Sequence, residues 1–463
     1  MPARLPVLFL ATLITAFLAT LSAAKQQPNI IYILLDDAGY GDLSCYGQKK
    51  FQTPNIDRLA REGMKFTNHY SGSTVCAPTR SVIMSGLHTG HTPSRGNREI
   101  QPVGQFPIPA ATFTIAEALK KAGYATGAFG KWGLGNPGSE GDPVNQGFDR
   151  FFGYNCQRNA HTYYPTWLFD NFQKIKLNGE TYAHDLIMDR AVEWIDNHHK
   201  APFFCFLPVT IPHAAMHVPE KYAAPFRRKF PEFENKVGRY GNNRPFARNP
   251  AAQFAGMMTA LDHGIGRVLK SLEKYGIEEN TIVLLSSDNG PHREGGHMPD
   301  YFNSNGGLRG HKRDLYEGGI RCPLLVRWPG KVKAGSTSDH ISAHWDLFPT
   351  FCELAGTETP RNLDGISFLP TLLGKKQEQH EYLYWEFFEG GGKRAVRIGK
   401  WKAVQNQLTR KGQNASVEIY DLTTDRAEQN NLATRKPELI ARARNIFKQA
   451  HTPSKIWKFK WEQ

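Results

Sequence analysis

Oxygen-bearing side chains follow two separate apolar runs of the chain. Asp36 and Asp37 come directly after NIIYILL, and Asp288 and Asn289 follow TIVLLSS. A short apolar run is typical of a buried parallel strand, and ligands of open α/β sheets gather outside the carboxyl ends of such strands. Carboxylate and amide oxygens suit a hard cation such as Ca²⁺ or Mg²⁺. Either pair alone could be a turn signal, but both pairs in one chain favour a metal site.

A lone thiol, Cys76, lies in the segment SGSTVCAPTR. A helix is expected to begin near Pro78, and the positive end of a helix dipole would lower the pKa of a thiol in front of it. Arg80, on the first turn of that helix, is placed to steer an anion or to pair with an acid. A half-buried loop cysteine is the alternative interpretation.

Further charged or basic side chains follow apolar runs or lie in a glycine-rich loop. Lys131 follows ATGAFG, His213 follows FFCFLPVT, and Lys312 lies in NGGLRGHKRDLYEGG. Prolines flank both His213 and His217, which disfavours a helical zinc-ligand pair. One hard cation, one isolated cysteine and several fixed positive charges suit an anionic ester whose charge must be neutralised.

Alternating patterns indicate the elements that must position these residues. Apolar runs at residues 29–35 and 125–130 alternate with helical patterns such as 114–122. This alternation predicts an α/β domain with a mainly parallel sheet covered by helices on both faces. After residue 373 a polar linker leads to short strand-like runs and a closing helix. We therefore expect a catalytic domain at 25–375 and a small antiparallel α+β domain at 376–463.

The N-terminus and the composition bear on location and partners. Residues 1–24 hold Arg4, an apolar run and small residues before Lys25, as in a cleaved secretory signal peptide. No later run is apolar and long enough to span a membrane. The net charge of +14 permits anionic partners, but the charge is spread along the chain, so nucleic acid is not expected. Of six cysteines, Cys205 and Cys352 lie in apolar runs and are expected to be buried thiols.

Several motifs give the sequence a more specific resemblance. CAPTR matches the C-x-P-x-R core of the type I sulfatases, and SVIMSGLHTG resembles the second half of that signature. GKWGLG resembles their second signature, while SSDNG and LYEGGIR match further blocks. The similarity runs from Asn29 to the C-terminus and is strongest toward arylsulfatase A and the N-acetylgalactosamine sulfatases. It implies an alkaline-phosphatase-like fold and a sulfuric ester hydrolase.

The resemblance also implies how the site would work. A maturation enzyme, either the formylglycine-generating type or an anaerobic one, would oxidise Cys76 to formylglycine. The hydrated form of formylglycine would attack the sulfur atom of the substrate's sulfate ester. Arg80 would stabilise the diol, Lys131 and Lys312 would bind sulfate oxygens, and His213 or Lys312 would protonate the leaving alcohol. One Ca²⁺ would be held by five side chains: Asp36, Asp37, modified Cys76, Asp288 and Asn289.

One position departs from the family pattern. Many relatives read G-K-W-H-L-G, where this chain has Gly133, so a histidine that assists the formylglycine hydroxyls is missing. His161, in the aromatic segment GYNCQRNAHTYYP, is one candidate to do that work, and an ordinary aromatic-loop residue is the alternative. His217, Arg158 and His311 are candidate contacts to a neighbouring sugar.

The expected substrate is a sulfated carbohydrate of the galactose or N-acetylgalactosamine type, or an aryl sulfate. The expected location is periplasmic or secreted, or lysosomal or extracellular in a eukaryote. Two alternatives stay open from the sequence. One is a phosphatase or phosphodiesterase of the same superfamily, which would generally need a two-metal site. The other is a non-catalytic sulfoglycan-binding protein, for which Gly133 is the only support.

Overall fold

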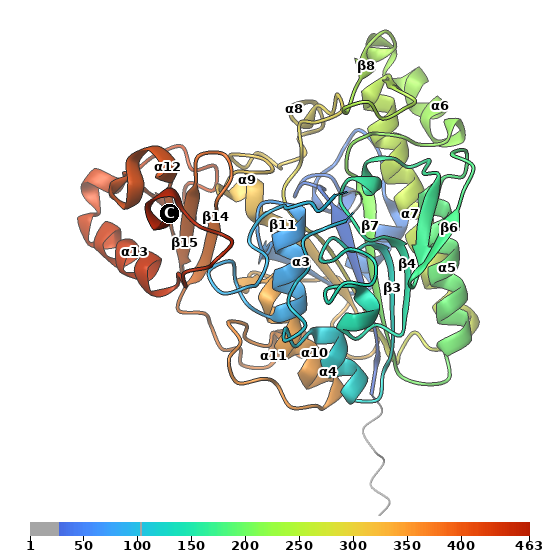
Figure 1. The fold of residues 1–463 in the computed structure, drawn as a ribbon, viewed down its shortest axis with the longest axis horizontal. Coiled ribbons are helices and arrows are strands. Elements are labelled where there is room, and N and C mark those ends of the chain that lie inside the picture. Colours follow the sequence, from blue (N-terminus) through green and yellow to red (C-terminus); the bar gives the residue numbers. More distant parts are fainter. Residues whose placement is uncertain (1–26, 102–103) are drawn as a thin grey trace, which may run out of the picture.

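A computed structural model describes residues 27–101 and 104–463 of the chain, and the expected signal peptide lies outside the described residues. An 11-stranded sheet runs through the larger part of the molecule, and a four-stranded sheet stands beside it (Figure 1). Across the large sheet the strands follow the order β12 (Ser336–Ser338), β2 (Met64–Tyr70), β11 (Arg321–Arg327), β10 (Thr281–Ser287), β1 (Asn29–Asp36), β7 (Phe203–Pro212), β3 (Ala125–Lys131), β4 (Arg150–Tyr154), β5 (Trp167–Asp170) and β6 (Gln173–Lys176), while β13 (Ser342–Ala343) pairs with β2.

The centre of the large sheet is parallel and its outer parts are mixed. Strands β10, β1, β7, β3 and β4 pair in parallel, whereas β11 is antiparallel to both β10 and β2. The predicted strand at 29–35 is confirmed and also includes Asp36. The predicted strand at 125–130 is confirmed and ends on Lys131.

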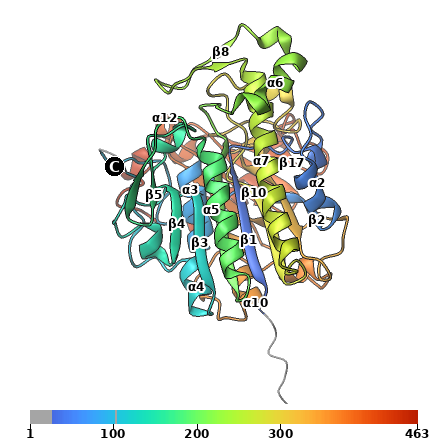
Figure 2. The same ribbon diagram turned by 90° about the vertical axis from the view of Figure 1, so that its right-hand side faces the viewer.

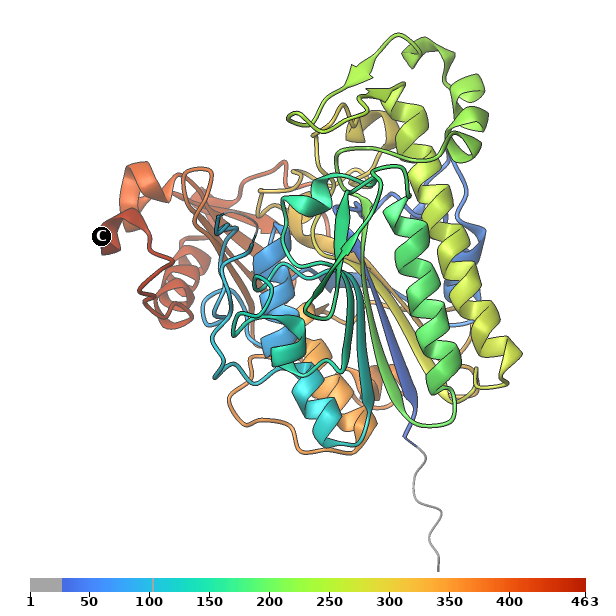
Figure 3. The ribbon, with the colours of Figure 1, turned by 45° about the vertical axis from the view of Figure 1, so that its right-hand side comes forward.

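Helices cover both faces of the large sheet (Figures 2 and 3). One face carries α2 (Pro54–Arg61), α5 (Ala183–His198) and α7 (Pro250–Lys274), and the other carries α3 (Cys76–Ser85), α4 (Ile115–Lys121) and α10 (Leu347–Ala355). Alternate residues of β1 serve the two layers: Ile31 and Ile33 join one hydrophobic core, and Ile30 and Tyr32 join the other. A strand buried on both faces must be apolar throughout, which explains the continuous apolar run.

The smaller sheet belongs to the C-terminal part of the chain. It consists of β14 (Leu383–Phe387), β15 (Lys393–Ile398), β16 (Trp401–Gln405) and β17 (Val417–Asp421), all antiparallel, with α13 (Pro437–Gln449) packed against it. This agrees with the predicted antiparallel α+β region. The boundary near residue 375 stays a prediction.

Shorter elements complete the fold: α6 (Glu220–Lys229), the hairpin of β8 (Val237–Gly238) and β9 (Ala247–Arg248), α8 (Pro299–Phe302), α9 (Glu317–Ile320), α11 (Leu369–Leu372) and α12 (Leu408–Lys411). All six cysteines are free thiols, and Cys205 and Cys352 are fully buried as expected. Within the described ranges, every helix is too short or too polar to cross a bilayer.

Candidate functional site

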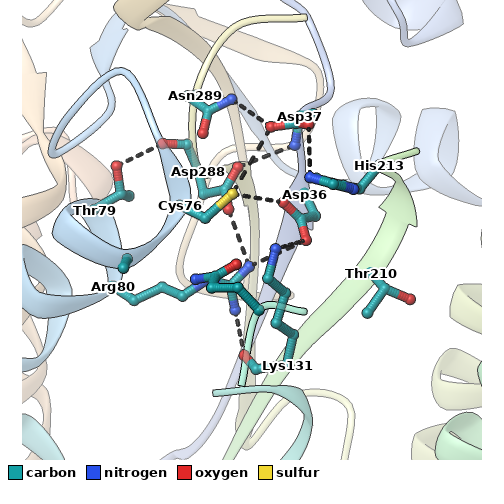
Figure 4. A network of polar contacts seen from close by, with 12 residues as sticks. Asp36, Asp37, Cys76, Thr79, Arg80, Lys131, Thr210, His213, Asp288 and Asn289 are labelled. Atoms are coloured by element: carbon teal, nitrogen blue, oxygen red, sulfur yellow. Dashed lines mark hydrogen bonds and ion pairs between the residues drawn. The ribbon is translucent and has the colours of Figure 1, made fainter. Parts of the chain in front are cut away.

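The two oxygen-bearing pairs meet at one edge of the large sheet. Strands β1 and β10 run in parallel with Leu35 opposite Ser287, so the residues that follow them emerge side by side. The Asp37 backbone N–H donates to Asp288 Oδ1 at 3.0 Å, and Asn289 Nδ2 donates to Asp37 Oδ1 at 2.7 Å (Figure 4). Asp37 has φ of 68°, a left-handed conformation that turns the chain sharply out of β1.

Cys76 faces this edge from the first residue of α3. Its Sγ lies 3.2 Å from Asp36 Oδ1 and 4.0 Å from Asp37 Oδ1. Thr79 Oγ1 donates to the Asp288 backbone carbonyl at 2.7 Å and so fastens the first turn of α3 to the end of β10. The helix begins at Cys76, two residues before the predicted start near Pro78.

The expected lowering of the Cys76 pKa is wrong for this structure. Burial raises the pKa of the Cys76 thiol well above its ordinary value, and the nearby Asp288 and Asp36 carboxylates add to this rise. The desolvation and the like charges outweigh the helix dipole, which is worth about 1 kcal/mol or less in exposed positions. As a free thiol, Cys76 is a poor nucleophile in this site.

Each buried carboxylate has its own cation. Lys131 Nζ lies 2.7 Å from Asp36 Oδ2, Lys312 Nζ 2.7 Å from Asp37 Oδ2, and Arg80 Nη2 3.0 Å from Asp288 Oδ2. Burial alone would raise the pKa of Asp36 and Asp37, but their lysine partners hold both below the ordinary range. These six side chains are at most 3 % exposed, so their charges act in a poorly screened environment.

The same residues offer a fitting set of donors for a hard cation. Asn289 Oδ1 is buried and has no hydrogen-bond partner among the described residues. Burial and the neighbouring Asp36 raise the pKa of Asp288 to about 7, against the opposing charge of Arg80. An unsatisfied amide oxygen beside three carboxylates is the chemistry that Ca²⁺ or Mg²⁺ would complete.

In a neighbouring cluster of possible metal ligands, the histidine is already engaged through both ring nitrogens. Asp37, His292 and Glu294 lie close enough to share an ion. However, His292 Nδ1 accepts the Glu294 backbone N–H at 3.0 Å, and His292 Nε2 lies 3.1 Å from the Pro212 carbonyl. Both ring nitrogens are already engaged, so His292 has no free lone pair for a second metal.

His213 stands beside the lysine that pairs with Asp37. Its Nε2 lies 3.2 Å from Lys312 Nζ and 3.5 Å from Asp37 Oδ2, while its Nδ1 contacts the Ala214 carbonyl. Burial and the Lys312 charge hold the pKa of His213 well below its usual value. His161 stacks on His213, with ring centroids 5.1 Å apart and planes at 2°, and Tyr240 meets the edges of both rings.

The remaining predicted sugar contacts lie in different surroundings. His217 Nε2 contacts the Pro245 carbonyl, and His217 lines a cavity of about 380 Å³ that includes none of the residues around Cys76. His311 lies 3.2 Å from an Arg293 nitrogen, next to Lys312 in the chain. Arg158 is exposed and forms an ion pair with Glu99.

One residue at the site escapes sequence reasoning. The side-chain amide of Gln157 fills the space at Gly133: a Cβ added to Gly133 would come within 2.6 Å of Gln157 Nε2 and 3.6 Å of Arg80 Cδ. Gln157 Nε2 is buried without a hydrogen-bond partner in the described structure. An amide N–H can donate but cannot take up a proton, so Gln157 occupies this space without supplying a base. No local motif marks it.

Comparisons with known proteins agree with this geometry. Residues 28–357 match the family model described as Sulfatase, and residues 309–450 match one described as N-sulphoglucosamine sulphohydrolase, C-terminal. The N-acetylgalactosamine-6-sulfatase of Mus musculus is 31 % identical over 84 % of this chain and 74 % of its own length. The N-acetylgalactosamine-6-O-sulfatase of Bacteroides thetaiotaomicron is 29 % identical over 92 % and 94 %. A solved structure of Ps i-CgsB with k-i-k-neocarrahexaose has a TM-score of 0.78, at 28 % identity over 92 % and 93 % of the two chains. The predicted alkaline-phosphatase-like architecture is thereby confirmed.

Proposed function

Because the chain belongs to the sulfatase family and is thus a sulfuric ester hydrolase, we propose that it removes sulfate from a sulfated carbohydrate at the site around Cys76. The observation that carries this proposal is the position of Cys76: its sulfur lies 3.2 Å from Asp36 at the start of α3, among Lys131, Lys312 and Arg80. Three fixed cations around one reactive position suit the negative charge of a sulfate ester and of its transition state.

We propose that Cys76 acts after oxidation to formylglycine. The raised pKa of the thiol supports this, because an unmodified Cys76 would hold too little thiolate to attack. The hydrated aldehyde supplies two hydroxyls: one forms the new O–S bond as the substrate O–S bond breaks, and the other loses its proton as the aldehyde reforms and sulfate leaves. A serine would stop after the first transfer.

The residues around Cys76 would divide the remaining work. We propose that Lys131 and Lys312 hold sulfate oxygens and that Arg80 holds the reacting hydroxyls. The leaving alcohol must gain a proton, and the contact of Lys312 Nζ with His213 Nε2 at 3.2 Å supports a shared role for this pair. Lys312 carries the proton, since Asp37 holds its pKa high against the opposing effect of burial, while His213 stays neutral.

Asp36, Asp37, Asp288 and Asn289 are proposed to hold one Ca²⁺ together with the modified Cys76. Two observations support this assignment: Asn289 Oδ1 is buried with no hydrogen-bond partner among the described residues, and the pKa of Asp288 is raised. When bound, the ion supplies charge that polarises the sulfate and the attacking hydroxyl.

The substrate is proposed to be a sulfated glycan of the galactose or N-acetylgalactosamine type. The matches to N-acetylgalactosamine-6-sulfatases support this choice. Tyr240 and His161 offer aromatic surface beside His213, and His217 lines the neighbouring cavity. Export to the periplasm, the outside of the cell or the lysosome is proposed from the signal-like sequence at residues 1–24.

The test combines mass spectrometry with a substrate panel. The Cys76 peptide, from a host with a maturation enzyme, should lose the mass that corresponds to replacing the thiol and one hydrogen by a carbonyl oxygen. The panel should contain N-acetylgalactosamine 6-sulfate, galactose 6-sulfate, an aryl sulfate and the matched aryl phosphate. Sulfate release that persists in Cys76→Ala would refute the mechanism. Preference for the phosphate would favour a phosphatase, and conversion without any release would favour a binding protein.

A further inference from the structure

A basic cleft lies apart from the candidate active site, between the edge of the large sheet and the small C-terminal sheet. Its volume is about 580 Å³, and none of the residues around Cys76 lines it. Thr67 and Asn68 of β2 form part of one wall, and the turn between β15 and β16 forms part of the other. We call it the inter-sheet cleft.

Positive side chains dominate the lining of this cleft. Arg321, Arg397, Lys400 and Arg426 all line it, and Asp339 is the one carboxylate among the described lining residues. Lys400 pairs with Asp421 at 2.8 Å and Arg321 with Glu317 at 3.1 Å. Arg397 and Arg426 have no carboxylate within ion-pair distance in the described part of the chain.

Behind the cleft, the buried charges do not cancel. Glu317 accepts ion pairs from both Arg321 and Lys402, and Lys402 lies 3.5 Å from Glu428. Burial and the neighbouring Glu317 raise the pKa of Glu428 to about 7, so near neutral pH this carboxyl is partly uncharged. Counting Arg397 with Arg321 and Lys402, three buried cations thus face two buried carboxyls, Glu317 and Glu428.

Arg397 is the most informative member of the group. Arg397 is only 5 % exposed. Its Nε donates to the Gly399 carbonyl, and its Nη1 contacts Asn68 and Tyr70. Its Nη2 makes no hydrogen bond to any described residue. A guanidinium that is fixed through Nε and Nη1 keeps Nη2 to donate to one oxygen of a bound anion.

We propose that the inter-sheet cleft is a second binding site for a polyanionic glycan, which takes a sulfate or carboxylate group at Arg397 and neighbouring groups at Lys400 and Arg426. The choice of a glycan over other polyanions rests on the proposed function, whereas the anion site itself does not. Binding at a second site would keep a long chain on the enzyme between turnovers and raise its local concentration.

The test uses the full chain with Cys76→Ala, so that no ligand is consumed. Binding of a fluorescein-labelled chondroitin 6-sulfate decasaccharide is measured by anisotropy. The pair Lys400→Gln with Arg426→Gln should weaken binding about fivefold to tenfold, as for two exposed charge contacts. The matched control is Lys331→Gln with Lys333→Gln, two exposed lysines in the loop beyond the opposite end of β11, which should change the affinity less than twofold.

Two results would overturn the proposal: unchanged affinity in the Lys400 and Arg426 pair, or an equal loss in the control pair. Arg397→Gln should weaken binding further, provided that its thermal melting curve shows a folded protein. If Arg397→Gln does not fold, the result for the exposed pair, Lys400→Gln with Arg426→Gln, tests the proposal by itself. Aryl sulfate hydrolysis by the unsubstituted protein is measured separately. If the proposed function is wrong, the unsubstituted protein will not hydrolyse the aryl sulfate. If only the second site is wrong, hydrolysis will persist and the two variant pairs will bind the decasaccharide equally well.

Discussion

Gly133 occupies a position where both the backbone and a neighbour exclude a side chain. Its φ is 80°, and a Cβ at this position would lie 2.6 Å from Gln157 Nε2. Gly133→Ala should therefore destabilise the protein by two separate effects. The left-handed backbone costs a non-glycine residue about 1–2 kcal/mol. The collision adds about 0.5–1.5 kcal/mol, the cost of a strained rotamer, because the end of the Gln157 side chain must turn aside in a buried site.

The expected loss for Gly133→Ala is thus about 1.5–3.5 kcal/mol in the free energy of unfolding. Gln157→Ala removes the colliding amide but leaves the backbone conformation unchanged. In that background, Gly133→Ala should cost only the backbone part, about 1–2 kcal/mol. The two substitutions should therefore couple by about 0.5–1.5 kcal/mol.

The assay is a double-mutant cycle measured by urea unfolding of the four proteins. Lys331→Gln serves as an exposed control that should leave the midpoint unchanged. Equal costs of Gly133→Ala with and without Gln157 would refute the contact. A cost below about 0.5 kcal/mol in both backgrounds, the range of ordinary surface changes, would refute the backbone argument as well.

Three further predictions concern the metal, the nucleophile and a buried carboxyl. Chelation by EDTA should lower the melting temperature and activity, and Ca²⁺ at a hundred times its Kd should restore about 2.7 kcal/mol; an unchanged melting curve would argue against the site at Asn289. Cys76→Ser should release alcohol from an aryl sulfate in a single burst without free sulfate, and sustained sulfate release would contradict the need for a second hydroxyl. Burial and Glu317 raise the pKa of Glu428 from 4.5 to about 7, while Lys402 and Arg309 oppose the rise. The folded state therefore favours the protonated carboxyl. The stabilising contribution of Glu428 is complete below pH 4.5 and is lost as the pH rises through 7. Glu428→Gln should therefore gain stability relative to the unsubstituted protein between pH 4.5 and 8, by at most about 3 kcal/mol in thermal or urea unfolding, and parallel pH profiles would contradict this.

Much of the fold could be predicted because its signals are local. The apolar run before Asp36 must be buried on both faces wherever it lies, and the capping pattern at Thr114 marks a helix start that the structure shows as a capping box. The start of α3 is harder to predict. Pro78 suggested a later beginning, but a proline within the first turn removes only an N–H that has no partner inside the helix, so the helix can begin at Cys76.

The candidate site also combines features that have a local sequence signal with features that have none. Local patterns identify the oxygen-bearing residues at the strand ends and the isolated Cys76 with its proline and arginine. No local pattern indicates the raised pKa of the Cys76 thiol, the position of Gln157 beside Gly133, or the place of Arg397 in a basic cleft with Arg426. These properties depend on burial and on contacts between residues far apart in the chain, and both arise only when the strands and helices have packed.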